Sequence, residues 1–535
     1  MNKTAFRGLF LLVLAGTLLL RLPRLGLRPM HHDEANQAVK FGTLLEKGEY
    51  RYDKTEHHGP SLYYLTLPVA WAFSKQTLAS LDETTLRLVP AIFGAGIILL
   101  LLFFGDGMGR PAVLFSGLLA ALSPAMTYFS RFYIQETLFV FFIVGFLGSL
   151  WRLAEHPSTG RALASGFFAG MMYATKETSI IIFAAVGGAI VLTIIFRKKT
   201  ISGRLPLPKI RMIHILWGLA AAAVTAFIFF SSFFKNPKGI LDSMIAFKGY
   251  FEKGGSAGFH APPLLYYLTL LAYSKSGAGP AWSEALILGL AIVGGAAAFQ
   301  KKDRRLLKAN AGRAEKPFSS ATSAENFFPK FIFFFTVLAT AAFSIIPYKT
   351  PWNLLPFYIG IILLAGMGAA FIFQSLRKDY LKVIAGLLLA AGLFHLGWQS
   401  CRANFQFYAD RRNPYAYAET SPDFLQLAKR IDRLAALHPE GRHMLIKVVC
   451  GLHQTWPLPW YLRSFDRVGY WQDWPTAGGF ERVPLIIADE DQAENLGPLL
   501  QDKYQAEYYG LRPDVLLVLF IDRGFWEKYL LDGKK

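Results

Sequence analysis

A series of long apolar runs that continues to residue 398 limits the folds that this chain can adopt more than any other feature. A helix of about 20 apolar residues spans the roughly 30 Å hydrocarbon core of a bilayer. Hydrophobic residues make up 53% of the 535 residues. The runs lie at roughly residues 6–22, 61–76, 87–104, 111–128, 134–153, 162–174, 178–196, 213–234, 263–273, 281–299, 329–347, 353–373 and 380–398. We therefore predict an α-helical polytopic membrane protein with about 11 to 13 transmembrane helices.

Three of these runs are short for a crossing. They are 61–76, 162–174 and 263–273. The runs 61–76 and 263–273 also carry or follow a proline, which interrupts a helix. We expect 61–76 and 263–273 to lie in the interface or to dip back. If 61–76 crossed instead, the acidic groups before it and those near residue 136 would lie on opposite sides of the membrane.

Positive charge is concentrated in three loops between apolar runs, at residues 197–211, 301–316 and 377–382, in a chain whose net charge is +19. Lysine and arginine clusters in short inter-helix loops mark the cytoplasmic side of a membrane protein. The basic character therefore indicates topology, and we expect no nucleic-acid partner. It also predicts a multi-pass protein of the cytoplasmic membrane that contacts membrane lipids. We expect the first apolar run to be retained as a helix, because many spans follow it.

With the amino terminus inside, four loops share the outer face. They are residues 23–60, 131–136, 235–280 and 348–353. The chain becomes polar after residue 398, where a helix at 422–437, strands at 444–449 and 483–488, and a strand pair within 504–520 are predicted. We therefore expect a transmembrane domain at 1–398, with outer loops 23–60 and 235–280, and an extracytoplasmic α/β domain at 399–535. Cys401 and Cys450 are the two cysteines, and whether they pair stays open.

Four titratable residues, His31 to Glu34, stand in a row just after the first apolar run. Charged groups at this depth are costly unless they have a partner or a function. Asp33 or Glu34 is the candidate general base, since a carboxylate within hydrogen-bond reach can take a proton from an attacking hydroxyl. The alternative is a solvated loop whose acids cap the following helix. Metal binding by the histidines and acids is less favoured, and the sequence leaves a divalent metal open without requiring any cofactor.

Further groups on the same predicted face could bind an anionic substrate. Lys54, His57 and His58 belong to the first outer loop, and Arg131 precedes the second acid, Glu136. A guanidinium suits a phosphate, although an internal ion pair between Arg131 and Glu136 is the alternative.

Two other positions carry weaker signals. Lys349 stands between two prolines that end neighbouring runs, so it could face an anion site or simply reach toward the interface. Lys176 and Glu177 form a similar pair that an exposed turn would also explain. Aromatic stretches around His260 and at 456–461 could stack on sugars or belong to the aromatic belt of the membrane interface.

Several of these motifs together resemble the GT-C membrane glycosyltransferases. They are the Asp33-Glu34 pair after the first helix, the Pro-aromatic run at 60–65, Arg87 at the start of the next run, and Ser130-Arg131 before Glu136. The nearest branch resembles the protein O-mannosyltransferase and aminoarabinose transferase superfamily. The Lys349-Thr-Pro-Trp turn and the stretch 456–461 are similar to the flippase-activity-associated membrane proteins of the archaeal N-glycosylation type.

This resemblance implies a GT-C-like catalytic domain that moves a sugar from a polyprenyl phosphate to a lipid, glycan or protein acceptor on the outer face, with inversion. By the same resemblance Asp33 is the base, Glu34 its neighbour, Arg131 a phosphate ligand and Glu136 the second acid. Many relatives have a lysine before the Pro-Pro of the first loop, where this chain has His58. Lys54, His57 or Lys349 is then left to supply the charge. The competing function is a non-catalytic flippase or scaffold of a surface-glycan assembly complex.

Overall fold

The computed structural model describes residues 1–54, 58–196, 210–255, 262–300 and 327–532. The chain divides into two compact units, each described here by itself. The first, called the helical unit, comprises Met1–Pro23, Tyr50–Leu65 and Arg87–Gln406. The second, called the α/β unit, comprises Arg24–Glu49, Thr66–Leu86 and Phe407–Lys535.

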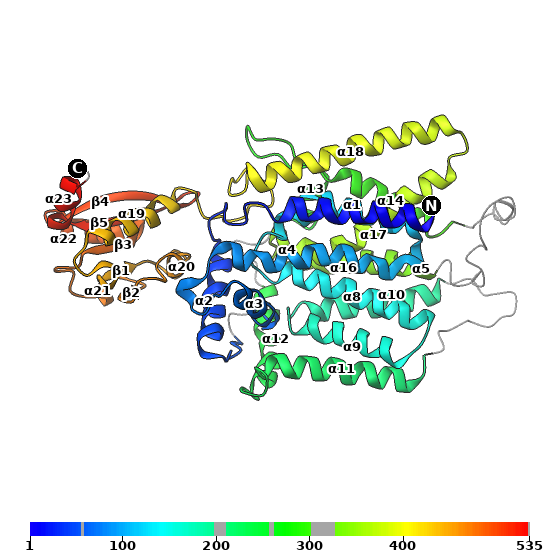
Figure 1. Cartoon of the computed structure of the whole chain (residues 1–535), viewed down its shortest axis with the longest axis horizontal. Helices are drawn as coiled ribbons and strands as arrows, with labels where there is room; N and C mark the ends of the chain where they lie inside the picture. The colour runs from blue at the N-terminus through cyan, green and yellow to red at the C-terminus, as the bar shows by residue number, and fades with distance from the viewer. Residues whose placement is uncertain (55–57, 197–209, 256–261, 301–326, 533–535) are drawn as a thin grey trace. The chain divides into compact units, whose positions relative to one another are not determined.

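The helical unit is a bundle of long apolar helices that run side by side (Figure 1). The helices that form the bundle are α1 (Lys3–Arg21), α4 (Glu83–Leu100), α6 (Arg110–Leu122), α8 (Glu136–Glu155), α9 (Thr159–Tyr173), α10 (Ser179–Ile195), α11 (Met212–Phe230), α14 (Ala285–Ala297), α16 (Phe327–Ile345), α17 (Leu355–Ser375) and α18 (Asp379–Phe405). The other helices of this unit are η2 (Leu101–Phe104), α5 (Gly105–Met108), α7 (Pro124–Phe129), α12 (Gly239–Gly255), α13 (Tyr266–Ala272) and η3 (Pro351–Leu354). Helices α3 (Ser61–Ala72) and α4 cross the division between the units.

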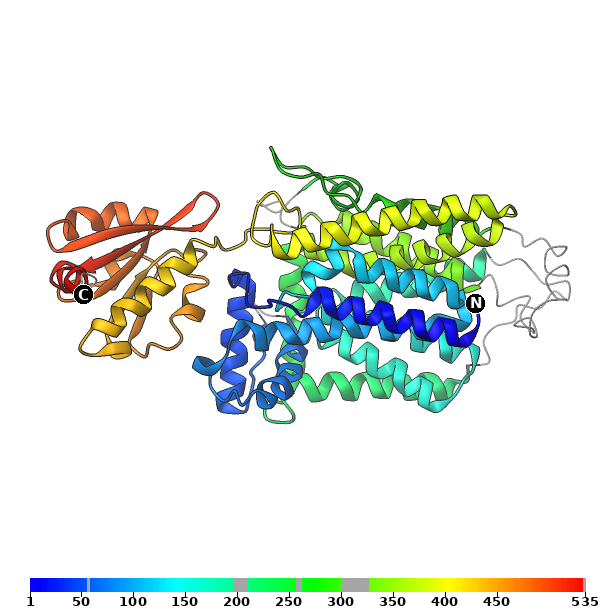
Figure 2. The ribbon, with the colours of Figure 1, turned by 45° about the horizontal axis from the view of Figure 1, so that its top comes forward.

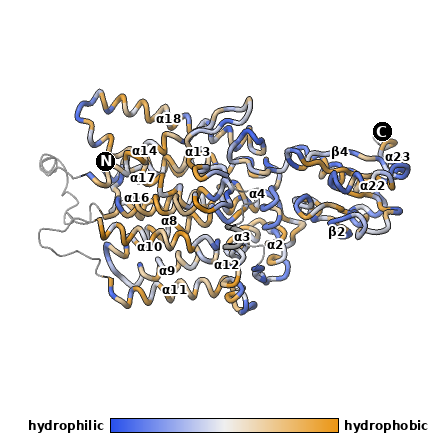
Figure 3. Tube along the Cα trace, turned by 180° about the vertical axis from the view of Figure 1, so that it is seen from behind, coloured by the Kyte–Doolittle hydropathy of each residue, from blue (hydrophilic) through white to orange (hydrophobic). Residues whose placement is uncertain are grey.

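Among the described residues, seven helices are long and apolar enough to cross a membrane, and α6, α10 and α14 are shorter apolar helices. Hydrophobic residues dominate these helices along their length (Figure 3). The prediction of a helical, multi-pass membrane protein is confirmed. The expected 11 to 13 crossings exceed the seven that satisfy these criteria of length and composition. Helix α3 has 12 residues and α13 has 7, lengths of only about 18 and 10 Å, so both are too short to cross as single helices.

Helix α17 is the most enclosed of the long helices, because 89% of its most apolar stretch of residues is buried. Small residues let its neighbours approach closely, as is common between membrane helices. A Cβ added at Gly366 would lie 2.0 Å from Ser116 Oγ and 2.6 Å from the backbone oxygen of Ala112, both in α6. No side chain larger than hydrogen fits there without moving α6.

The α/β unit contains a five-stranded sheet in the order β2-β1-β3-β5-β4. The strands are β1 (Ile446–Val449), β2 (Val468–Trp471), β3 (Leu485–Asp489), β4 (Tyr504–Arg512) and β5 (Val515–Asp522). Strand β1 pairs in parallel with β2 and β3, whereas β5 pairs antiparallel with β3 and β4. The helices of this unit are α2 (His32–Lys47), η1 (Leu78–Ser80), α19 (Phe424–Leu437), η4 (Gly441–His443), α20 (Leu458–Tyr461), α21 (Trp474–Ala477), α22 (Glu490–Leu500) and α23 (Arg523–Asp532).

Side chains of successive strand residues point to opposite faces of the sheet, and both faces carry apolar residues. One face, which includes Ile487 and Leu519, packs with α19 through Leu427, and α19 is visible beside the sheet in Figure 2. The other packs with α22 and includes Ile486 and Phe520. The predicted small α/β domain is thus confirmed, including the helix near 422–437 and four of the five strands. Strand β2 was missed because it has four residues, none of them buried.

The predicted boundary between residues 398 and 399 lies within α18, which continues to Phe405. Residues 24–49 cluster with the α/β unit because their polar backbone groups bond to it. The hydroxyl of Thr420 donates to Met30 O at 2.7 Å, and Met30 N–H donates to Tyr461 Oη at 2.9 Å. Cys401 and Cys450 are both free thiols, so no disulfide joins them.

The close packing at Gly366 gives a direct test. We expect Gly366→Ala to destabilise the protein by roughly 1–3 kcal/mol, because its methyl group would overlap the backbone of α6. The matched control is Gly386→Ala in α18, where nothing lies within 4 Å of the added Cβ. Thermal unfolding in detergent measures both variants, and equal melting temperatures would contradict this account of the packing.

Candidate functional site

Helix α2 begins directly at the acidic pair, and His31 caps it. Asp33 N–H donates to His31 Nδ1 at 3.0 Å, and His31 N–H donates to Glu34 Oε2 at 3.1 Å, which completes a capping box. His31 Nε2 lies 3.1 Å from the backbone oxygen of Tyr417. Because an amide N–H can only donate and a carbonyl can only accept, the imidazole tautomer with its proton on Nε2 fits both contacts. Both ring nitrogens are therefore used in holding the start of α2.

Glu34 and Asp33 have opposite environments although they are adjacent. Glu34 is fully buried, and its carboxylate lies 3.7 Å from the Arg28 guanidinium, which is also 3.7 Å from the Glu419 carboxylate. The Asp33 side chain is 42% exposed, and its carboxylate lies 3.9 Å from His31 Nδ1. Glu34 thus has the contacts of a capping and pairing residue, whereas the Asp33 carboxylate is open to a reacting group.

His32 lies beside this pair, with its ring centroid 6.0 Å from that of Trp456. Burial lowers the pKa of His32 to about 4, against an opposing effect of the Asp33 carboxylate. His32 is therefore neutral near pH 7.

In the aromatic stretch 456–461, Trp460 is fully buried and donates its Nε1–H to Glu83 Oε1 at 2.8 Å. Trp460 is accordingly a packing residue with a satisfied polar atom and offers no surface to a sugar.

Within the helical unit, three distant segments meet at a buried ion pair. Lys176 Nζ lies 2.5 Å from the carboxylate of Glu136, the first residue of α8, and 3.0 Å from Asn353 Oδ1 of η3. The exposed fractions of the Lys176 and Glu136 side chains are 4% and 2%. The structure therefore pairs Glu136 with Lys176 and not with Arg131. Lys176 is no exposed turn residue, and sequence reasoning underestimated it.

Glu177 organises a second buried cluster next to this pair. Its carboxylate lies 2.8 Å from His58 Nδ1 and accepts a hydrogen bond from the Tyr52 hydroxyl at 3.1 Å. Burial and the Glu177 charge raise the pKa of Tyr52 well above its usual value. His58 therefore has an acidic partner within hydrogen-bond distance.

A close backbone approach fixes the segment that carries His58. A Cβ added at Gly59 would lie 2.2 Å from Ala174 O, and Ser61 N–H donates to the same oxygen at 3.0 Å. The hydroxyls of Ser61 and Thr175 are 2.7 Å apart. The loop is thus tied to the turn between α9 and α10, which supplies both Lys176 and Glu177.

Arg131 and Lys349 are both buried cations of the helical unit. Arg131 is 6% exposed, donates to Arg21 O at 2.7 Å and lies 4.8 Å from the centre of the Phe405 ring. Lys349 is 3% exposed and donates to Pro262 O at 3.2 Å.

The remaining substrate-binding candidates have weaker structural support. Lys54 is exposed, and His57 and His260 lie outside the described residues. Within the described ranges, no group of three or more His, Cys, Asp or Glu residues is arranged to hold a metal ion.

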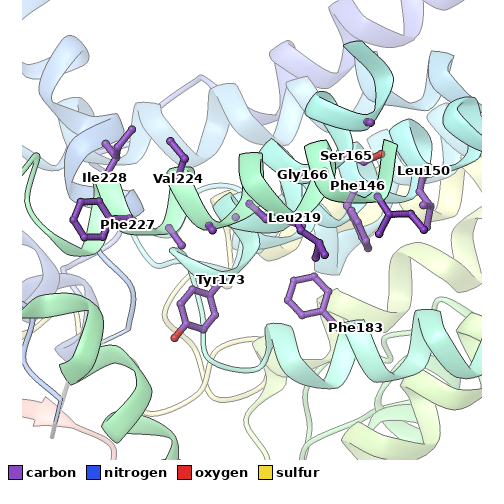
Figure 4. Close-up of a pocket in the computed structure, with 18 of the residues that line it drawn as sticks. Phe146, Leu150, Ser165, Gly166, Tyr173, Phe183, Leu219, Val224, Phe227 and Ile228 are labelled. Atoms are coloured by element: carbon purple, nitrogen blue, oxygen red, sulfur yellow. The ribbon is translucent and has the colours of Figure 1, made fainter. Parts of the chain in front are cut away.

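An apolar groove of about 1220 Å³ follows α11 between α8, α9, α10 and α12. Figure 4 shows Phe146, Phe183 and Tyr173 near it, with Leu219 and Phe227 from α11. Small residues of α9 and α11 form part of its lining, among them Gly166, Gly170, Gly218, Ala222 and Ala223. Apart from the hydroxyls of Ser165 and Tyr173 and the His214 ring, its lining side chains are apolar. Such a groove is suited to a hydrocarbon chain.

Comparisons with known proteins agree with this architecture. The family model of dolichyl-phosphate-mannose-protein mannosyltransferases matches residues 68–223. The crystal structure of ArnT from Cupriavidus metallidurans, bound to undecaprenyl phosphate, superposes with a TM-score of 0.60 at 17% identity. It covers 97% of this chain and 98% of ArnT. A search of curated proteins finds no significant match.

An archaeal oligosaccharyltransferase shares the fold as well. AglB from Archaeoglobus fulgidus, in complex with an inhibitory peptide and a dolichol-phosphate, gives a TM-score of 0.52 at 12% identity, over 95% of this chain and 73% of AglB. The solved structures share the GT-C fold of membrane glycosyltransferases with this chain, and the family match over residues 68–223 supports the same class. The predicted class is therefore confirmed, and the narrower resemblance to the flippase-activity-associated proteins stays a prediction.

The buried ion pair predicts a strong asymmetry between single and double substitutions. We expect Lys176→Met to cost about 3–5 kcal/mol, because it leaves the Glu136 carboxylate buried without its cation. The double variant Lys176→Met, Glu136→Leu should recover most of this loss. Thermal unfolding measures Lys176→Met, Glu136→Leu and the double variant, with Lys382→Met as the control, since the Lys382–Asp379 pair is exposed. A double variant less stable than either single one would contradict the assignment.

Proposed function

We propose that this protein transfers a hexosyl or pentosyl group from a polyprenyl phosphate to a hydroxyl of a glycan, lipid or protein acceptor, with inversion at the anomeric carbon. The observation that carries the proposal is the Asp33 carboxylate, which is 42% exposed at the start of α2 in a chain with the GT-C fold. The solved relatives bound to undecaprenyl phosphate and dolichol-phosphate support a polyprenyl donor. We place the reaction on the outer face of the cytoplasmic membrane, with the α/β unit outside.

In the proposed reaction Asp33 accepts the proton of the acceptor hydroxyl as its oxygen attacks the anomeric carbon. A new carbon–oxygen bond forms, the bond from the anomeric carbon to the phosphate oxygen breaks, and its electron pair leaves with the lipid phosphate. Arg131 and Lys349 stabilise the negative charge of this leaving group, and a low-dielectric environment strengthens that attraction. His58 and Lys54 are further candidates for the donor phosphate.

Glu34 and Glu136 act in this proposal by holding other groups. Glu34 fixes the first turn of α2, and therefore the direction of Asp33, through the capping box. Glu136 keeps Lys176 in place beside Asn353. Lys176 is consequently a further cation that could approach the donor phosphate if it left Glu136.

The role of Asp33 is tested by Asp33→Asn. We expect turnover with a polyprenyl-phosphate sugar to fall by about a hundredfold to ten-thousandfold, the usual contribution of a general base, while donor binding is retained. The control is Asp82→Asn, because Asp82 is an aspartate of similar exposure, 41%, that lies just before the start of another helix, α4. Near wild-type turnover of Asp33→Asn would exclude Asp33 as the base. A wild-type protein that consumes no donor from a broad panel would favour the scaffold function.

The apolar groove along α11 is the proposed site for the polyprenyl chain of the donor. Ala223 lines it, whereas Ala220 is on the same helix, is exposed and does not line it. We expect Ala223→Phe to raise the KM for the polyprenyl donor about tenfold, because the ring occupies space that the chain needs, whereas Ala220→Phe leaves it unchanged. Equal KM values for the two variants would show that the chain lies elsewhere.

A further inference from the structure

The α/β unit has a groove of its own, far in sequence from the proposed catalytic residues. Helix α22 packs over β3 and β5, and the edge strand β4 extends beside it. The space between α22 and the β4–β5 pair is a cavity of about 550 Å³, within the range of small-molecule sites.

The floor of this groove is rigid and apolar. Tyr504, Val518 and Phe520 are each at most 6% exposed. The Tyr504 hydroxyl lies 2.6 Å from the backbone oxygen of Phe480 and 3.0 Å from that of Val483, and these two acceptors of its single proton fix the ring. At the open end, Tyr508 is 69% exposed and Leu516 is 41% exposed. An uncovered aromatic ring beside an aliphatic side chain offers a flat apolar surface, of the kind on which the C–H face of a sugar ring stacks.

The rim of the groove supplies hydrogen-bond acceptors. Glu490 and Glu494 lie one turn apart on α22, and Gln501 follows the end of that helix. Among the described residues that line the groove, none is a lysine, arginine or histidine. Carboxylates accept from hydroxyl and ammonium donors and repel anions, so the charge of the rim excludes phosphorylated or acidic ligands.

An extended peptide added to the edge of β4 is a poorer occupant. Gly510 N–H donates to Asp423 Oδ2 at 2.7 Å, and Leu511 O accepts from Ser421 N–H at 2.9 Å. Ala506 O accepts from Gln505 Nε2 at 3.1 Å. These bonds use backbone groups that strand addition would need.

We propose that this groove binds a saccharide that carries hydroxyl or ammonium donors and no acidic group. The sugar stacks on Tyr508 and Leu516, and its donors bond to Glu490, Glu494 and Gln501. This site is separate from the proposed transfer chemistry and would stand if Asp33 were not the base.

The test uses the full-length protein in lipid nanodiscs and measures ligand binding by saturation-transfer NMR. Three ligands are titrated separately: the tetramer of glucosamine, which is cationic, the tetramer of N-acetylglucosamine, which is neutral, and the tetramer of galacturonate, which is anionic. We expect the cationic and neutral tetramers to bind saturably and the anionic one not to bind. Tyr508→Ala should weaken both by about tenfold, because it removes the stacking surface. The matched control is Tyr470→Ala, since Tyr470 is a 41% exposed tyrosine of β2 that does not line the groove.

A second variant keeps the test independent of the aromatic residue. Glu494→Gln retains an acceptor and removes a charge, so it should weaken the glucosamine tetramer several-fold and leave the N-acetylglucosamine tetramer unchanged. A Lys-Thr repeat peptide of the same charge is the competitor. The proposal is overturned if neither saccharide binds, if Tyr508→Ala binds as tightly as Tyr470→Ala, or if the peptide binds more tightly than the glucosamine tetramer.

Discussion

The Lys176–Glu136 ion pair is the interaction on which the polar end of the helical unit depends. Charges among apolar helices are tolerated only when they are paired and hydrogen-bonded. This pair joins the start of α8 to the turn before α10, and Asn353 adds the segment before α17. Next to it, Glu177 holds Tyr52 and His58. Four stretches that are far apart in sequence are thereby fixed around two carboxylates.

In the α/β unit, the contacts of His31 and Glu34 fix the start of α2. His31 uses both ring nitrogens, one for the Asp33 amide and one for Tyr417 O. Glu34 closes the capping box from the buried side of the helix. Because adjacent helical residues point about 100° apart, the same cap that buries Glu34 leaves Asp33 exposed. The cap is thus what distinguishes two carboxylates that look equivalent in the sequence.

Local patterns were sufficient to predict most of the helices and strands and the class of fold. Apolar runs of near-bilayer length predicted the long helices, and the change to mixed polarity after residue 398 predicted the sheet-containing unit. The interaction partners of the charged groups could not be predicted from local patterns. Lys176 and Glu177 read as an ordinary turn between two runs, and Arg131 was weighed as the partner of Glu136. A Lys-Glu pair flanked on both sides by apolar sequence was the available signal, since it implies that partners must come from elsewhere.

The sequence by itself determined that this chain is a helical membrane protein with a small α/β unit and an acidic pair after its first helix, because helix length, hydropathy and motif spacing are properties of neighbouring residues. Only the tertiary structure decided which acid is exposed, which cation neutralises Glu136, and that His58 contacts Glu177. It also decided where grooves form along α11 and beside β4. These outcomes depend on contacts between residues that are distant in the chain, and burial sets their energies far more than the identity of the residue alone.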